Sequence, residues 1–231
     1  MVNELLSGAA ALGLELNEAQ VAALERYAAL LVEKNAVMNL TAITAPAEIA
    51  RLHFLDSLSL LTLAAFRAKR VLDVGCGAGF PGVPLKLGEP SIELTLLDST
   101  AKRMAWLSGE LLPALGLEAE CLTGRAEELS VGRREGYDLC VSRAVARLNM
   151  LCELCLPYVK VGGSFLAMKG AQADDELAEA NAAIRTLGGS VRRIAEYPIG
   201  DAIHRVVIID KVQKTPTKYP RRFAKIKQQP L

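Results

Sequence analysis

The stretch from Asp73 to Phe80, DVGCGAGF, limits the possible folds more narrowly than any other part of this chain. Its first two residues end the short apolar segment Val71–Val74, which we interpret as a strand, and a helical segment comes after it. Glycines in such a turn leave backbone N–H groups free and let a ligand come close, because no Cβ atoms stand in the way. The turn therefore predicts a ligand site at a strand end of an open α/β sheet.

Asp98 strengthens this prediction. It ends the apolar run 93–98, which we expect to be the neighbouring strand, and it lies 25 residues after Asp73. A carboxylate at that strand end can accept hydrogen bonds from both ribose hydroxyls of an adenosine-containing cofactor. The glycine turn and the acid together are much more specific than either feature alone.

Strand-like and helical segments alternate along most of the chain. The N-terminal third is expected to be helical, with a capping box at Asn17 and Gln20 and with Pro46 in the first turn of a second helix. Alternation after Arg70 predicts a doubly wound α/β domain, in which helices cover both faces of a mainly parallel sheet. Gly200-Asp201 permits a hairpin-like reversal between the last two strands. The later strand-like segments are 119–122, 137–142, 163–168, 190–198 and 204–210.

Three regions are expected: a helical extension (1–66) packed on the core, a cofactor-binding core (67–210) and a basic tail (211–231). The tail holds seven basic residues and no acid, so the rest holds 27 − 7 = 20 bases against 26 acids, a balance of −6. This asymmetry favours a tail that meets a polyanion, although a solvated solubility tail is the alternative. The seven bases are Lys211, Lys214, Lys218, Arg221, Arg222, Lys225 and Lys227.

Composition is that of an ordinary globular protein, with 51% hydrophobic and 23% charged residues. No apolar run approaches the ~18 residues that span a bilayer, and the start MVNELLSGAA does not resemble a secretory signal. The five cysteines, mostly in apolar runs, suit reduced thiols, so we expect a cytoplasmic protein. Cys152 and Cys155 lack a second pair at zinc spacing, so we expect packing residues and no metal site.

The glycine-rich region also allows a rival interpretation. Residues 77–82 match G-x-G-x-x-G, the dinucleotide fingerprint, which would make the protein an NAD-linked oxidoreductase. In that register the turn starts two residues later, beyond the expected strand end. Asp73 would also place a carboxylate near a negative pyrophosphate, whereas a cationic sulfonium cofactor tolerates that charge better. A turn without any ligand is a third interpretation.

Several motifs, in this order, resemble the bacterial ribosomal small-subunit guanine-N7 methyltransferase family, also called glucose-inhibited division protein B. The resemblance covers nearly the whole chain. DVGCGAGFPG alone indicates only a methyltransferase, while HFLDS, LLDSTAKR and SRA make the match specific. The motifs are MNLTAIT (38–44), HFLDSL (53–58), VLDVGCGAGFPGVPL (71–85), LLDSTAKRMAWL (96–107), GRAEEL (124–129), VSRAVARL (141–148), MKG (168–170) and TPTKYPRR (215–222).

This resemblance implies a Rossmann-like class I methyltransferase with a mainly parallel, seven-stranded sheet and N-terminal helices. It implies S-adenosyl-L-methionine as cofactor, N7 of a guanine in 16S rRNA as the methyl acceptor, and 16S rRNA or the small-subunit ribosomal particle as partner. The first glycine and the phenylalanine would line the site, and the two later glycines would shape the turn. The acid would hold the ribose with two hydroxyl residues beside it, and the 126–127 pair would lie along the adenine. The implied cofactor-binding residues are Gly75, Gly77, Gly79, Phe80, Asp98, Ser99, Thr100, Ala126, Glu127 and Arg143.

Other polar residues near these motifs allow two interpretations each. Arg143 would face the reactive end of the cofactor and the incoming base, or it forms an ordinary ion pair. His53 and Asp56 lie one helical turn apart and either pair with each other or contact RNA near the mouth of the site. Lys169 either contacts phosphate or ends a strand. Trp106 is expected in the core rather than as a stacking platform for a base.

Residue chemistry narrows the type of methyl transfer. The segment after the expected fourth strand, 142–145, lacks the Asn/Asp-Pro-Pro-aromatic loop that is usual for exocyclic amino methylation. None of the five cysteines follows a proline, as a cytosine-C5 nucleophile usually does. Guanine N7 carries an in-plane lone pair and no proton, so we expect no catalytic general base. A non-catalytic RNA-binding protein with a cofactor-binding fold is the remaining alternative.

Overall fold

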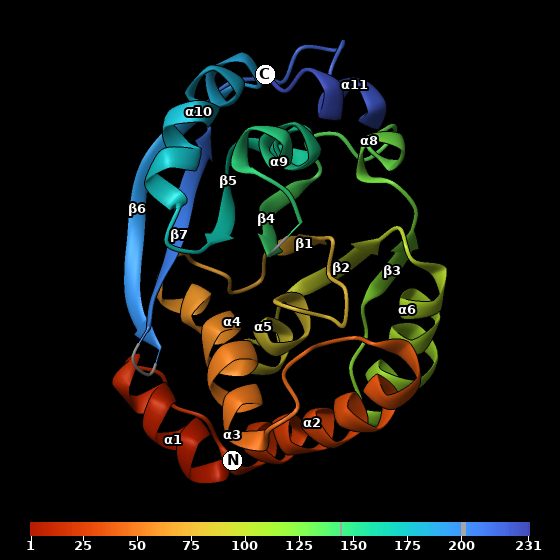
Figure 1. Cartoon of the computed structure of the whole chain (residues 1–231), viewed down its shortest axis with the longest axis vertical. Helices are drawn as coiled ribbons and strands as arrows, with labels where there is room; N and C mark the ends of the chain where they lie inside the picture. The colour runs from red at the N-terminus through yellow and green to blue at the C-terminus, as the bar shows by residue number, and fades with distance from the viewer. Residues whose placement is uncertain (144, 200–201) are drawn as a thin grey trace.

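One seven-stranded sheet organises the described part of the chain, residues 1–143, 145–199 and 202–231 of a computed structural model. The order is β3-β2-β1-β4-β5-β7-β6, and only the pairs that involve β7 are antiparallel (Figure 1). The predicted doubly wound α/β class is therefore confirmed. The strands are β1 (Arg70–Val74), β2 (Glu93–Asp98), β3 (Glu120–Thr123), β4 (Tyr137–Arg143), β5 (Val159–Lys169), β6 (Gly189–Ile199) and β7 (Ala202–Lys211).

Buried strand residues alternate between two apolar clusters because successive side chains point to opposite faces of the sheet. Val71 and Leu96 belong to the cluster that includes the N-terminal helices, whereas Leu72 and Leu97 belong to the other. Both faces are therefore covered, which explains why the central strands read as continuous apolar runs. The helices after β1 are α5 (Gly82–Gly88), α6 (Ala101–Trp106), α7 (Leu112–Ala114), α8 (Ala126–Leu129), α9 (Leu148–Cys155), α10 (Ala173–Thr186) and α11 (Phe223–Gln228).

The N-terminal helices are α1 (Val2–Ala11), α2 (Glu18–Met38), α3 (Pro46–Ile49) and α4 (Asp56–Leu58), with π-helical residues 50–55 between the last two. The predicted capping box is confirmed: Asn17 Oδ1 accepts from Gln20 N, and Gln20 Oε1 accepts from Asn17 N, both at 2.9 Å. The Gln20 amide also donates to the carbonyl of Leu87 at 2.9 Å, at the end of α5. This cap therefore ties α2 to the core.

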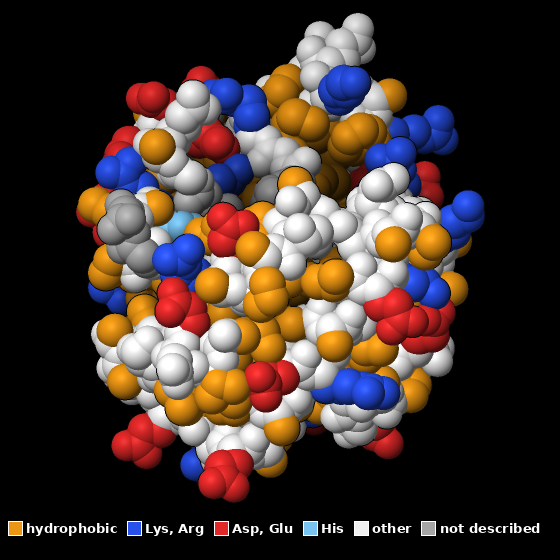
Figure 2. All heavy atoms as spheres, turned by 60° about the horizontal axis from the view of Figure 1, so that its bottom comes forward, with side chains coloured by type: hydrophobic (Ala, Val, Ile, Leu, Met, Phe, Trp, Pro, Cys, Tyr) orange, Lys and Arg blue, Asp and Glu red, His pale blue; other side chains and the backbone are white. Residues whose placement is uncertain are grey.

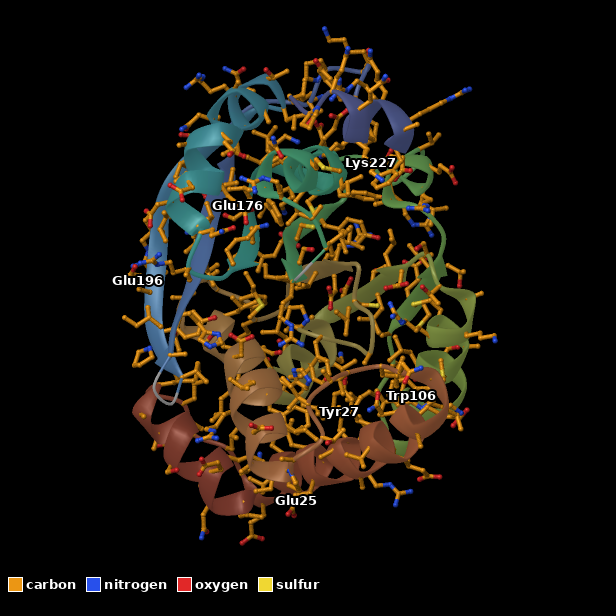
Figure 3. The ribbon with its side chains drawn as sticks, in the orientation of Figure 1. Glu25, Tyr27, Trp106, Glu176, Glu196 and Lys227 are labelled. Carbon is orange, nitrogen blue, oxygen red and sulfur yellow. The ribbon has the colours of Figure 1, made fainter. Side chains whose placement is uncertain are left out.

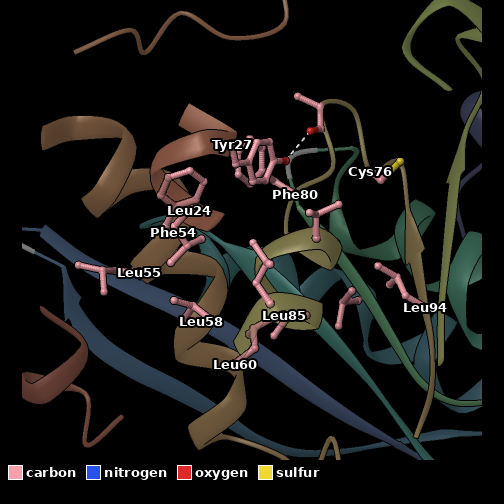
Figure 4. Packing of buried hydrophobic residues seen from close by; sticks show 14 of the residues in the cluster. Leu24, Tyr27, Phe54, Leu55, Leu58, Leu60, Cys76, Phe80, Leu85 and Leu94 are labelled. Atoms are coloured by element: carbon pink, nitrogen blue, oxygen red, sulfur yellow. Dashed lines mark hydrogen bonds between the residues drawn. The ribbon is translucent and has the colours of Figure 1, made fainter. Parts of the chain in front are cut away.

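An aromatic stack joins the N-terminal helices to the glycine turn. Tyr27 on α2 stacks on Phe80, with ring centroids 5.1 Å apart and planes 6° from parallel, and Phe54 packs at the edge of both. The Tyr27 hydroxyl donates to the carbonyl of Ala78 at 2.6 Å (Figure 4). The N-terminal extension thus holds the turn in place, and the division of the chain into 1–66, 67–210 and 211–231 stays a prediction.

The C-terminal tail folds back onto the body of the protein. Lys211, at the end of β7, is buried and donates to the carbonyls of Leu156 and Val159 at 2.6 and 3.0 Å. Arg221 pairs with the buried Glu153 at 2.6 Å. Two of the seven tail bases are therefore bonded to the body of the protein, and α11 lies beside α8 (Figure 1).

Other sequence predictions have clear outcomes. All five cysteines are free thiols, and Cys152 and Cys155 are fully buried, as predicted for packing residues. Trp106 lies in the core, also as predicted. The expected reversal at Gly200-Asp201 lies outside the described residues. None of the helices in the described ranges is both long and apolar enough to span a membrane.

Asp73 is buried beneath the glycine turn. Its Oδ2 accepts from the amide of Gly82 at 2.7 Å, while Oδ1 has no partner among the described residues. Burial, the largest effect, raises the pKa of this carboxyl to about 7. Asp73 lines neither of the two cavities at the strand ends that are described below.

Asp73→Asn should remove a pH-dependent loss of stability. The folded pKa near 7 lies above the ordinary value of 3.8, so the folded state binds more protons between these values and stability falls as pH rises through them. The variant should gain about 2–4 kcal/mol over wild type at pH 8 and less at pH 5. Urea unfolding measures both, with the exposed Glu93→Gln as control. An equal difference at the two pH values contradicts this assignment.

Candidate active site

Two cavities lie at the carboxyl ends of the strands, where β1 has β2 on one side and β4 on the other. This is the switch point of the sheet, the usual ligand position in doubly wound folds. We name the smaller, about 280 Å³, the Asp98 cavity and the larger, about 480 Å³, the Arg143 cavity. Val145 and Ala146 line both, so the two adjoin. Figure 2 shows a hollow on one face with Lys and Arg side chains on its rim.

Asp98 ends β2 and lines the Asp98 cavity, although it is only 6% exposed. Its Oδ1 accepts from the amide of Thr100 at 2.8 Å, and its Oδ2 accepts from the amide of Gly77 at 3.0 Å. Each carboxylate oxygen keeps a further lone pair. The carboxylate is therefore fixed in place and can still accept two hydrogen bonds from a ligand. Thr100 precedes α6, and its side chain makes no capping hydrogen bond to that helix.

The glycine turn meets the cavity through only part of its length. Gly75 lines the cavity at φ +73°, and a Cβ there would overlap the side chain of Val145. Gly77 contributes the amide that binds Asp98. Gly79, at φ +101°, packs instead against the Tyr27 hydroxyl, and Phe80 is buried in the aromatic stack. Gly79 and Phe80 thus shape the turn on the side away from the cavity. Phe80 was predicted to line the cavity, but it does not.

The far end of the Asp98 cavity comes from the segment after β3 and from the C-terminus. Ala126 and Glu127, which were predicted to lie along the adenine, both line it, and burial raises the pKa of the Glu127 carboxyl. The sequence did not indicate Phe223, which also lines it from the start of α11. Of the ten predicted residues, those that line this cavity are Gly75, Asp98, Ser99, Thr100, Ala126 and Glu127.

The Arg143 cavity is rich in charge. Arg143 lines it from the end of β4, Lys169 from the end of β5 and Glu176 from α10. Figure 3 labels Glu176 on that helix. Lys169 Nζ is nearly buried, lies 2.7 Å from Glu176 and donates to the carbonyl of Ala146 at 2.6 Å. Lys169 therefore does more than end a strand, because it fixes the segment that separates the two cavities.

Arg143 is held by the N-terminal helical segment. Its Nη1 donates to Asp56 at 3.1 Å and to the carbonyl of Leu52 at 3.0 Å, and its guanidinium lies 4.9 Å from the Phe80 ring centroid. Asp56 is itself 4% exposed and accepts from Tyr197 on β6 at 3.1 Å and His204 on β7 at 2.7 Å. This buried carboxylate thus joins α4, β4 and the β6–β7 pair.

His53 and Asp56 do not pair with each other, so that prediction was wrong. His53, in the π-helical stretch, and Asp56, at the start of α4, both contact Arg143, whose Nη2 lies 3.2 Å from His53 Nδ1. Burial, and then the Arg143 charge, lowers the pKa of His53 to about 4. His53 is therefore neutral near pH 7: its Nδ1 accepts from Arg143, and its Nε2–H donates to the Thr41 hydroxyl at 2.8 Å.

The chain is similar to known proteins over nearly its whole length. The sequence pattern of the family described as "rRNA small subunit methyltransferase G" matches residues 20–201. The chain belongs to this family. The protein named Ribosomal RNA small subunit methyltransferase G of Alkaliphilus oremlandii is 44% identical over 98% of this chain and 97% of its own length. That of an Exiguobacterium strain is 45% identical, covering 95% of this chain and 94% of its own length.

Solved structures support the fold. TrmN from Thermus thermophilus has a TM-score of 0.54 at 22% identity, over 68% of this chain and 48% of its own. A SAM dependent methyltransferase from Aquifex aeolicus has a TM-score of 0.53 at 17% identity, over 71% of this chain and 93% of its own. The Rossmann-like class I fold is thus confirmed, and membership of a methyltransferase family shows the oxidoreductase alternative to be wrong.

Proposed function

We propose that this protein transfers a methyl group from S-adenosyl-L-methionine to N7 of a guanine in 16S rRNA. The observation that carries the proposal is the junction of two cavities: one holds a fixed carboxylate beside a glycine turn, and the other is lined by cations. The small-subunit ribosomal particle is the alternative form of the substrate, and the cytoplasm is the proposed location.

The Asp98 cavity fits the proposed cofactor. The free lone pairs of Asp98 suit two ribose hydroxyls. Gly75, whose missing Cβ makes room for the side chain of Val145, would lie beside the amino-acid part of the cofactor. Ser99 and Thr100 would flank the ribose, and Ala126 and Glu127 would flank the adenine. Gly77, Gly79 and Phe80 act through the shape of the turn. When bound, S-adenosyl-L-methionine supplies an electrophilic sulfonium methyl group.

The Arg143 cavity suits a guanine and its phosphate. Arg143 donates to the carbonyl of Leu52 and to the carboxylate of Asp56. A methylated guanine gains positive charge, so a guanidinium directed at N7 would oppose product formation. Arg143 and Lys169 would instead fix the cavity wall, while Asp56 positions Arg143.

The chain needs to bind and orient the base and exclude water, without removing a proton. Guanine N7 has no proton to lose, and His53, the only histidine in contact with Arg143 among the described residues, is neutral near pH 7. Burial raises the pKa values of the thiols of Cys76, Cys152 and Cys155. Such thiols are poor nucleophiles, which argues against cytosine-C5 methylation.

The test uses small subunits and naked 16S rRNA from cells that lack this gene, incubated with the protein and methyl-labelled S-adenosyl-L-methionine. Digestion to nucleosides should place the label in N7-methylguanosine. RNA transcribed with 7-deazaguanosine should accept none, since the nucleophilic nitrogen is replaced by carbon. Label in another nucleoside overturns the N7 assignment, and cofactor binding without any transfer supports the non-catalytic alternative.

Five exposed bases of the tail remain as proposed RNA contacts: Lys214, Lys218, Arg222, Lys225 and Lys227. Lys225→Ala with Lys227→Ala should lower the slope of log affinity against log salt by about 1.4, if both meet phosphates of single-stranded RNA. RNA binding measured from low to high salt tests this. An unchanged slope leaves both lysines as solubility residues.

A further inference from the structure

The C-terminal segment reaches back to the far end of the Asp98 cavity. Phe223 is the first residue of α11, and its half-buried side chain lines the cavity beside Ala126, Glu127 and Leu154. Asp98 lies in the same cavity at the end of β2. If Asp98 takes the ribose, Phe223 therefore lies toward the base that the ribose carries.

Strong contacts hold this segment against the body of the protein. Glu153 of α9 is fully buried and accepts from Arg221 Nη2 at 2.6 Å, from its Nε at 2.8 Å and from its backbone amide at 2.8 Å. Arg134 donates to the carbonyls of Tyr219 and Thr215. A buried carboxylate with a bidentate guanidinium is costly to separate, so the position of Phe223 is fixed rather than incidental.

Apolar packing adds a second anchor. Ile226, one turn after Phe223, is fully buried in the cluster that also contains Leu154, Ala126 and Tyr219. The Arg125 guanidinium lies over the Phe223 ring, 4.9 Å from its centroid. A cation over an aromatic ring restrains the ring at low cost, because the charge is attracted to the π face. The aromatic side chain is thus pre-organised at the cavity.

From these contacts we infer that Phe223 is a cofactor-binding residue, the aromatic wall against which the adenine of the cofactor packs. The inference rests on the proposed function, since it needs an adenosine-containing ligand in the Asp98 cavity. Flat aromatic rings stack on bases with substantial energy and without hydrogen bonds. The tail that the sequence suggests for RNA binding therefore also completes the cofactor site.

Phe223→Ala should weaken S-adenosyl-L-methionine binding about tenfold, measured by calorimetry. Arg221→Ala should have a similar effect, because it releases the segment that carries Phe223. The double variant, Phe223→Ala with Arg221→Ala, should bind the cofactor only slightly less tightly than whichever single variant has the lower affinity. The exposed Gln228→Ala, on the same helix, is the matched control and should bind as wild type does. Equal affinity of Phe223→Ala and wild type overturns the inference, while a wild-type protein that binds no cofactor overturns the proposed function instead.

Phe223→Trp keeps an aromatic ring and gives a second readout. The natural chain has one tryptophan, the buried Trp106, so the difference in fluorescence between the variant and wild type reports position 223. Addition of S-adenosyl-L-methionine should quench the variant and leave wild type nearly unchanged. This arm decides the matter if Phe223→Ala fails to fold, since a saturating cofactor that leaves the variant's fluorescence unchanged also overturns the inference.

Discussion

Asp98→Ala is expected to weaken S-adenosyl-L-methionine binding about 100-fold while the protein stays folded. Two hydrogen bonds to a charged carboxylate are lost, and each is worth about 1.5–3 kcal/mol. The fold should survive because, among the described residues, the carboxylate accepts hydrogen bonds only from the backbone amides of Gly77 and Thr100, and its ion pair with Arg103, at 3.9 Å, involves a partly exposed guanidinium. Calorimetry measures the dissociation constant, and thermal unfolding checks the fold.

Two further variants sharpen the Asp98 test. Glu93→Ala changes an exposed acid at the opposite end of the same strand and should leave the dissociation constant unchanged. Asp98→Asn keeps one acceptor oxygen and should lie between wild type and Asp98→Ala. A dissociation constant that is the same for wild type and Asp98→Ala would show that Asp98 does not bind the ribose.

Arg143→Ala is expected to lower the single-turnover methylation rate about 100-fold, because small errors in the position of a reacting group are costly. The variant frees the cavity wall and leaves the buried Asp56 with only Tyr197 and His204 as partners. Arg143→Lys should recover part of the rate, since an ammonium can reach one of the two acceptors but not both. Binding of the cofactor should change little, because Arg143 lines the other cavity.

The pH profile separates positioning from proton transfer. Wild type, Arg143→Ala and Arg143→Lys should all show no ionisation of an essential base between about pH 6 and 9. The rates are also measured in the Asp73→Asn background, because that buried carboxyl has a pKa of about 7 but lines neither cavity. A steep single-proton rise that one carboxylate or histidine substitution abolishes would reject a mechanism without a base.

Local signals made part of the site predictable. The glycine turn and Asp98 depend on strand ends a few residues away, and the capping box at Asn17 depends on residues of one helical turn. The carboxyl ends of parallel strands then meet at one edge of the sheet, so the position of Asp98 followed from the alternation of strands and helices. The fold class was predictable for the same reason.

The remaining features depend on packing that spacing does not reveal. Phe80 follows the glycines directly, but its ring turns toward Tyr27, so proximity in sequence did not give a place in the cavity. Phe223 is brought to the site by the buried pair of Arg221 and Glu153, which the sequence presents only as part of a basic run. Asp56 likewise joins three elements through contacts that are distant in sequence.

Methyl transfer to N7 of a guanine in 16S rRNA is tested most directly by a map of N7-methylguanine in this RNA from cells with and without this gene. Borohydride reduction followed by aniline treatment cleaves RNA at this nucleoside. One cleavage should be absent from cells that lack the gene. It should return when the wild-type protein is supplied, and it should not return when Asp98→Ala is supplied. The same cleavage pattern in cells with and without the gene would show that this protein does not methylate guanine N7 in 16S rRNA.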